Sequence, residues 1–152
     1  MDLLKSFLLI IIYNLILISC STSKSQLSDY AEQVDIVGVE AWLNLMPGGP
    51  GSFHLTGEYE SMNDFILKSK LTTIKVYSDS ELIYEIKSEN INCELQIGQD
   101  IQALRNRFNI RGGLKLNERI QTTEKLDVKL IFELNGDLFE KDVNDIFLTR
   151  AY

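Results

Sequence analysis

Hydrophobic and polar residues alternate along most of the chain after residue 33, with a period of two. Because successive side chains of a β-strand point to opposite faces, this period predicts strands with one buried face. The clearest strand spans residues 126–134, and its inward set is Leu126, Val128, Leu130, Phe132 and Leu134. It ends at Asn135-Gly136, a dipeptide that favours a tight hairpin turn.

The partner of this strand begins at Leu138. Its register is open between pairing through Phe139 and Val143 and pairing shifted by one residue. Residues 146–148 are apolar and form a candidate for a separate final strand.

Val34 to Met46 is the longest apolar, β-branched run after residue 33. Its alternation places one set of residues inward: Val37, Val39, Ala41, Leu43 and Leu45. Gly38 lies inside this run, which predicts a β-bulge that divides it into two strand segments. Pro47-Gly48-Gly49-Pro50-Gly51 then ends the strand, since proline lacks an amide donor and glycine allows positive φ.

Five further segments predict strands. Ser52 to Glu60 turns Phe53, Leu55 and Tyr59 to one side, and residues 71–77 and 82–87 flank a turn and predict a hairpin. In residues 91–97 the inward set includes Cys93, which is predicted to be a small core residue. Phe108 and Ile110 alternate with polar residues before Gly112-Gly113, and residues 98–104 favour a single helical turn.

Seven or eight short strands in a little over 100 residues predict an all-β domain. The arrangement favoured by this count is an immunoglobulin-like, two-sheet antiparallel sandwich. A small β-barrel fits the same strand count and stays open as the alternative.

The N-terminal segment has a different pattern, with Lys5 followed by an apolar run from Phe7 to Ile18 that Asn14 interrupts. This run is shorter than a membrane-spanning helix requires and is typical of a processed signal peptide. The run ends in Leu17-Ile18-Ser19-Cys20, which resembles the lipobox of bacterial lipoproteins. The resemblance implies a signal peptide over residues 1–19 and fatty acyl chains on Cys20.

Residues 20–33 are then predicted to be a flexible tether, with a short helical turn near its end as an alternative, and residues 34–152 the folded domain. The expected location is the bacterial cell envelope with the membrane reached through the lipid on Cys20. Ser21, in place of Asp, favours the outer membrane by analogy with enteric lipoproteins.

The net charge and the number of cysteines limit the kinds of partner and of cross-link to expect. The formal net charge is −7 at pH 7, which argues against a nucleic-acid partner because such binding needs clustered Lys and Arg. With Cys20 lipidated, Cys93 has no cysteine partner, so no internal disulfide is expected.

The sequence contains no catalytic motif, and no cofactor is predicted. The candidate contact surface is the loop Pro47, Gly48, Gly49, Pro50 and Gly51 together with His54, because rigid scaffolds carry function on loops. Residues 42–50 and 53–57 resemble a segment of small envelope lipoproteins of unassigned role, which implies no activity. The function expected is a non-enzymatic module that binds an envelope protein or glycan.

Other residues of the sequence offer ligands or reactive groups for different functions. Met46, His54 and Met62 offer soft ligands for a copper carrier, and a barrel with an apolar interior suits lipid binding. Glu58 and Glu60 share a strand face and fit an acid/base pair. Further candidates are an arginine cluster for an anionic partner at Arg105, Arg107 and Arg111, and an oxygen-rich set for Ca²⁺ at Asn135, Asp137, Asp142, Asn144 and Asp145.

Overall fold

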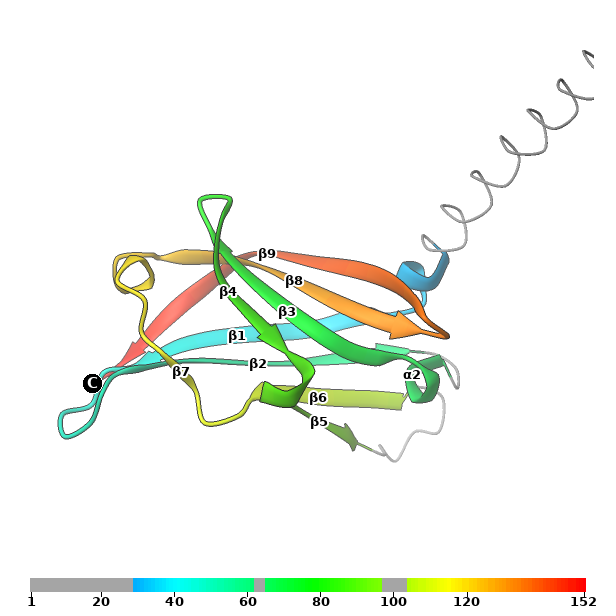
Figure 1. The fold of residues 1–152 in the computed structure, drawn as a ribbon, viewed down its shortest axis with the longest axis horizontal. Coiled ribbons are helices and arrows are strands. Elements are labelled where there is room, and N and C mark those ends of the chain that lie inside the picture. The colour runs from blue at the N-terminus through cyan, green and yellow to red at the C-terminus, as the bar shows by residue number, and fades with distance from the viewer. Residues whose placement is uncertain (1–28, 62–64, 97–103) are drawn as a thin grey trace, which may run out of the picture.

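The computed structural model describes residues 29–61, 65–96 and 104–152, and most of these residues lie in strands (Figure 1). The predicted all-β class is confirmed. The strands are β1 (Asp35–Asn44), β2 (Ser52–Ser61), β3 (Lys70–Ser78), β4 (Glu81–Lys87), β5 (Ile91–Gln96), β6 (Leu104–Ile110), β7 (Leu114–Lys115), β8 (Lys125–Leu134) and β9 (Asp137–Ala151). Between them lie the short helices α2 (Phe65–Lys68), η1 (Ser88–Asn90) and η2 (Arg119–Gln121).

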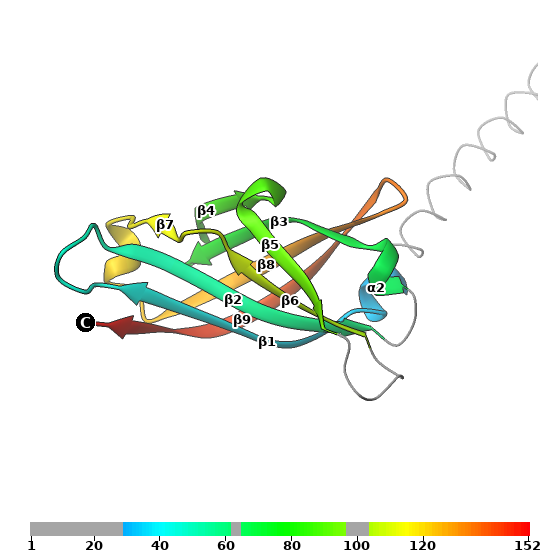
Figure 2. The ribbon, with the colours of Figure 1, turned by 90° about the horizontal axis from the view of Figure 1, so that it is seen from below.

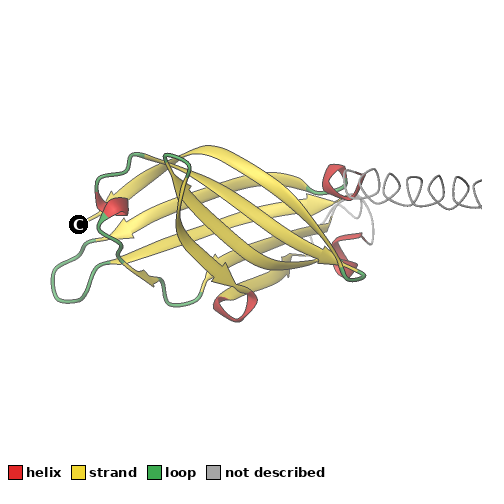
Figure 3. Ribbon diagram, turned by 45° about the horizontal axis from the view of Figure 1, so that its top comes forward, coloured by secondary structure: helices red, strands yellow, loops and turns green. Residues whose placement is uncertain are grey.

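These strands form one continuous sheet that curls around its inner face as a half-barrel (Figure 3). The order is β4-β3-β8-β9-β1-β2-β6-β5, and β7 makes a short pairing with β2. Every pairing among the described strands is antiparallel except that of β1 with β9, which is parallel. A two-sheet antiparallel sandwich of immunoglobulin type is not confirmed, because strand pairing is unbroken from β4 to β5.

The continuity of the sheet depends on a bulge in β9. Leu126 pairs with Ile146 and Val128 with Val143, so Asn144 and Asp145 together face Asp127. Asp145 adopts a φ of 59°, and its backbone N–H donates to Asp127 Oδ1 at 3.0 Å. A bulge of this kind bends a strand. β9 therefore pairs with β8 before the bulge and over residues 146–147, and its last four residues, 148–151, pair with β1 (Figure 2).

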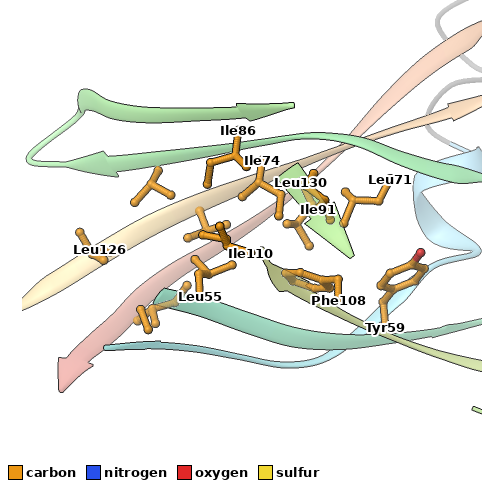
Figure 4. Close-up of a cluster of buried hydrophobic side chains, with 14 of the residues drawn as sticks. Leu55, Tyr59, Leu71, Ile74, Ile86, Ile91, Phe108, Ile110, Leu126 and Leu130 are labelled. Atoms are coloured by element: carbon orange, nitrogen blue, oxygen red, sulfur yellow. The ribbon is translucent and has the colours of Figure 1, made fainter. Parts of the chain in front are cut away.

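The core fills the concave face of this sheet with aromatic and branched side chains. Tyr59 and Phe132 meet edge to face with ring centroids 5.0 Å apart, and Phe132 stacks on Phe139 at 5.2 Å. Figure 4 shows aliphatic side chains of β3 and β4 facing those of β2 and β6 across the interior. The members of the predicted inward set of β8 are all buried. Burial of this apolar surface is the main contribution to folding.

Tyr84 links β4, one edge of the curled sheet, to β2, β7 and the residues that follow β7 on the opposite side of the core. Its ring stacks on Phe53 at 5.0 Å. Its hydroxyl donates to the carbonyl of Lys115 and accepts the N–H of Asn117, both at 2.9 Å. Burial raises the pKa of this hydroxyl, so it stays protonated and able to donate.

The predicted bulge at Gly38 is confirmed by a register shift between Ile36 and Gly38 in the β1–β2 pairing. The prediction that Val37 faces inward is wrong, because Val37 is 46% exposed. Val37 is the extra residue of the bulge, so the inward set changes phase across it, with Ile36 packed against the core before the bulge and Val39 after it. Val39 is partly buried, and Ala41 and Leu43 are buried as predicted.

Both predicted hairpins are present. β3 and β4 join through residues with left-handed backbone at Asp79 and Ser80. β8 and β9 join at Asn135 and Gly136, whose φ values are 54° and 92°. Of the two registers that the sequence allows for this hairpin, the structure has the one that pairs through Phe139 and Val143. Residues 146–148 continue β9 instead of forming a separate strand.

Residues 29–32 form the helical turn that the sequence left as an alternative at the end of the tether. Tyr30 packs against Phe65 and Phe139, and Lys141 Nζ donates to the carbonyl of Ala31 at 2.9 Å. These contacts make Tyr30 and Ala31 part of the packing of the domain. Cys20, the signal peptide, Met62, Ile97 and the turn predicted at residues 98–104 lie, apart from Leu104 itself, outside the described residues.

Replacing Gly57 with alanine tests the packing of the core. Gly57 lies opposite Phe108 in the β2–β6 pairing, and a Cβ there meets Phe108 Cζ at 2.5 Å and the Gly38 carbonyl oxygen at 2.8 Å. Because one of these neighbours is backbone, Gly57→Ala is expected to lower the free energy of unfolding by about 1–3 kcal/mol in urea titrations. Gly49→Ala is the matched control, since nothing lies within 4 Å of its Cβ position. Equal stability of the two variants contradicts the packing described.

Candidate functional site

The predicted contact loop joins β1 to β2 at one end of the long axis of the domain (Figure 1). Residues 46–50 are exposed, and Gly48 has a φ of 108°, which favours glycine. The C-terminus lies at the same end, where the backbone N–H of Leu45 donates to the carbonyl of Ala151 at 2.7 Å. The helical turn through which the chain enters lies at the opposite end (Figure 1).

His54 lies on the outer face of the sheet, beyond the loop, directly opposite Trp42. The two rings stack with centroids 5.1 Å apart and planes 7° from parallel. His54 Nε2 and Ser52 Oγ are hydrogen-bonded at 2.8 Å. A Cβ on Gly113 would lie 2.6 Å from His54 Cε1, so the Gly113 backbone also contacts the imidazole. His54 is therefore a packed part of an aromatic surface on β1 and β2.

The copper ligands proposed from sequence are not brought together within the described residues. Met46 is 56% exposed in the loop, four positions from the cross-strand partner of His54, and Met62 lies outside the described residues. No cluster of three or more His, Cys, Asp or Glu side chains in the described part of the chain is arranged to hold a metal ion.

Two of the charged clusters turn out to be partners of each other. β2 and β6 pair with Glu58 opposite Arg107 and Glu60 opposite Arg105. Arg105 contacts Glu60 at 2.9 Å and Glu58 at 3.5 Å, and Arg107 Nε lies 3.7 Å from Glu58. The carboxylates are thus held by guanidinium groups on a partly exposed face. Glu58, Glu60, Arg105 and Arg107 thus neutralise one another, whereas Arg111, the third arginine of the predicted cluster, is exposed in the turn after β6.

The oxygen-rich residues considered for Ca²⁺ are spread along β9 and its hairpin turn. Asp142 lies 3.7 Å from Lys129, and Asp145 accepts a hydrogen bond from Lys125 at 2.8 Å. That hydrogen bond raises the pKa of Lys125. Asn135 lies in the hairpin turn and Asp145 in the bulge, both with left-handed backbone, so local conformation explains their presence.

The outer face is hollowed on both sides of β1. The larger hollow, which we name the β1–β9 cleft, has a volume of about 620 Å³ and is lined by Val39, Glu40, Ala41 and Trp42 of β1 and by Val143, Asn144, Asp145, Ile146, Phe147 and Thr149 of β9. A second hollow of about 450 Å³ lies over β2 and β6 and includes His54, Thr56, Arg107 and Asn109. Glu40 and Trp42 line both hollows.

Sequence reasoning missed the cleft. Trp42 lies between the inward residues Ala41 and Leu43 and so faces outward, but the sequence pattern gave no role to Glu40 or to Phe147. Phe147 is 69% exposed, and Lys125 Nζ lies 5.0 Å above the centre of its ring. The sequence feature that could have indicated this surface is Trp42, a large aromatic residue that the alternation of its strand assigns to the outer face.

The prediction that Cys93 is a core residue is wrong, because Cys93 is exposed on the edge strand β5. It does lie on the inward side, opposite Phe108 and beside the buried Tyr59. Burial of the thiol on that side raises its pKa, and a hydrogen bond with Tyr59 partly opposes the shift. Burial also raises the pKa of the Tyr59 hydroxyl, which accepts the Asn106 amide at 3.3 Å.

Comparison with known protein families finds no family model that matches this chain, and comparison with curated proteins finds no match. Within the described residues, no helix is both long enough and apolar enough to cross a bilayer.

The raised pKa of Cys93 predicts slow alkylation near neutral pH. In a Cys20→Ser variant, where Cys93 is the only cysteine, its rate with iodoacetamide is expected to rise with pH at a higher midpoint in the folded protein than in urea. The physical reason is that the thiolate is the nucleophile and the folded thiol loses its proton at higher pH. Coincident midpoints in the folded and unfolded chains would show that the thiol is not perturbed.

Proposed function

We propose that this protein is a lipid-anchored, non-catalytic binding module of a bacterial cell envelope, attached to the membrane through Cys20. The observation that carries the proposal is the polarity of the domain. The helical turn at residues 29–32 lies at one end of the domain, and the Pro47–Gly51 loop, exposed over residues 47–50, lies at the other (Figure 1). A module tethered at its entry end presents the loop and the neighbouring outer face away from the membrane.

The sequence upstream of residue 29 supports the tethering. The residues between Cys20 and the packed helical turn are mostly small or polar. Fully extended, nine residues reach about 30 Å at roughly 3.3–3.6 Å each. The tether is long enough to place the domain beyond the lipid headgroups, and the partner expected there is an envelope protein or glycan, with the outer membrane as the location.

Binding suits this site better than catalysis. Glu58 and Glu60 are each ion-paired with arginine, and the imidazole of His54 is packed between Trp42 and Gly113. Groups held in this way recognise a surface through shape and charge. We also propose that the domain has an immunoglobulin-like architecture, because the two halves of the curled sheet face each other across one core.

Metabolic labelling with palmitate tests the anchor. The wild-type chain is expected to incorporate label and to have the mass of a protein that begins at Cys20, whereas Cys20→Ser is expected to lose all label and to leave the membrane fraction. Cys93→Ser is the matched control, because it removes the other cysteine and should keep the label.

Two results would contradict the anchor. One is labelling that persists in Cys20→Ser and disappears in Cys93→Ser. The other is a mature mass that still includes residues 1–19.

A further inference from the structure

The β1–β9 cleft lies where two parallel strands of one sheet separate. Pairing between β1 and β9 covers only Ala41–Asn44 and Leu148–Ala151. Before these residues, β1 pairs with β2 alone and β9 pairs with β8 alone. Each strand therefore has one edge along the cleft without a ladder partner, over residues 35–40 of β1 and 137–147 of β9.

Unpaired strand edges are places where another strand adds, because the row of N–H and C=O groups is already aligned for pairing. The open edge of β1 spans six residues, or about 20 Å at roughly 3.3 Å per residue. The cleft lies against the start of the β1–β9 ladder, and from there the open edges of β1 and β9 run toward the turn at residues 29–32, where Lys141 Nζ donates to the Ala31 carbonyl. The length of the open β1 edge suits a short extended segment.

The charges beside the cleft favour a cationic side chain on that segment. The Glu40 side chain is exposed and makes no ion pair or side-chain hydrogen bond with any residue that the structure describes. Two nearby cations already have partners, since Lys125 is paired with Asp145 and Lys141 donates to the Ala31 carbonyl. Lys125 also lies over the Phe147 ring, which shows that this aromatic face accommodates an ammonium group.

We propose that the β1–β9 cleft binds an extended segment of a partner protein, which adds as a strand along the open edge of β1 and places a Lys or Arg side chain beside Glu40, Trp42 and Phe147. Because β1 and β9 run parallel, a strand antiparallel to β1 is antiparallel to β9 as well. Apolar side chains of the segment that point inward meet Val39 and Val143. This proposal rests on the proposed binding function and names its ligand class.

The test uses the full chain in detergent and a blocked hexapeptide that alternates valine with lysine. Trp42 is the only tryptophan, so its fluorescence reports binding directly. The peptide is expected to change this fluorescence and to protect the amides of residues 36–40 from hydrogen exchange. Glu40→Gln is expected to weaken binding about two- to fivefold, as for an exposed charge pair. Glu89→Gln, an equal charge change on η1, should have no effect.

Three comparison ligands separate the alternatives. A valine–glutamate peptide and a valine–lysine peptide with alternate N-methylated amides are both expected to lose binding, the first through charge and the second through the missing donors. Equal binding of the N-methylated peptide overturns strand addition. A response to an N-acetylglucosamine oligomer without any response to the peptide also overturns the proposal, in favour of a glycan. Either failure leaves the palmitate result, and hence the anchor, untouched.

Discussion

The fold depends on one local backbone feature, the bulge at Asn144–Asp145. A non-glycine residue with left-handed backbone is uncommon and needs support from its surroundings. Here the N–H of Asp145 donates to Asp127, and its carboxylate accepts Lys125. With the bend supported on both sides, β9 pairs with β8 along most of its length and with β1 only at its end. One strand thereby joins the two halves of the sheet, and the same bend opens the cleft between β9 and β1.

Much of the strand content follows from local pattern. The alternation in residues 126–134, the turn at Asn135-Gly136 and the glycine in the first strand predict β8, its hairpin and the bulge of β1, because each is a property of neighbouring residues. The sheet order is different. Alternation shows which face a side chain takes but not which strand lies beside it, so the parallel pairing of residues 41–44 with 148–151 had no local signal. Asn144 and Asp145 were candidates for a Ca²⁺ site because oxygen-bearing side chains suit both metal ligands and residues with left-handed backbone.

The candidate site likewise combines features that local sequence pattern predicts with features that depend on which strands pair. The exposed loop and the outward position of His54 were predicted from breakers and period. Pairing of Glu58 and Glu60 with Arg105 and Arg107 depends on the register of two strands about 45 residues apart, which composition does not contain. Cys93 lies on the predicted inward face but is exposed instead of buried. The reason is that the edge strand β5 extends past the residues that cover its inner side. The position of Glu40 in the cleft depends on β9 lying beside β1, which no local pattern in the sequence contains.

The bend in β9 connects the fold with the proposed binding surface. The bend in β9 sets the curl, the curl encloses the aromatic core, and the divergence of β9 from β1 leaves open strand edges on an outer face that also carries Trp42 and His54. Native-state hydrogen exchange at low urea tests most directly whether β9 unites the two halves. The account predicts that core amides of β8 and of β2 open with the same free energy and the same urea dependence, as one cooperative unit. Exchange of β3, β4 and β8 through a separate, lower-energy opening, while β1, β2 and β6 stay protected, would contradict it.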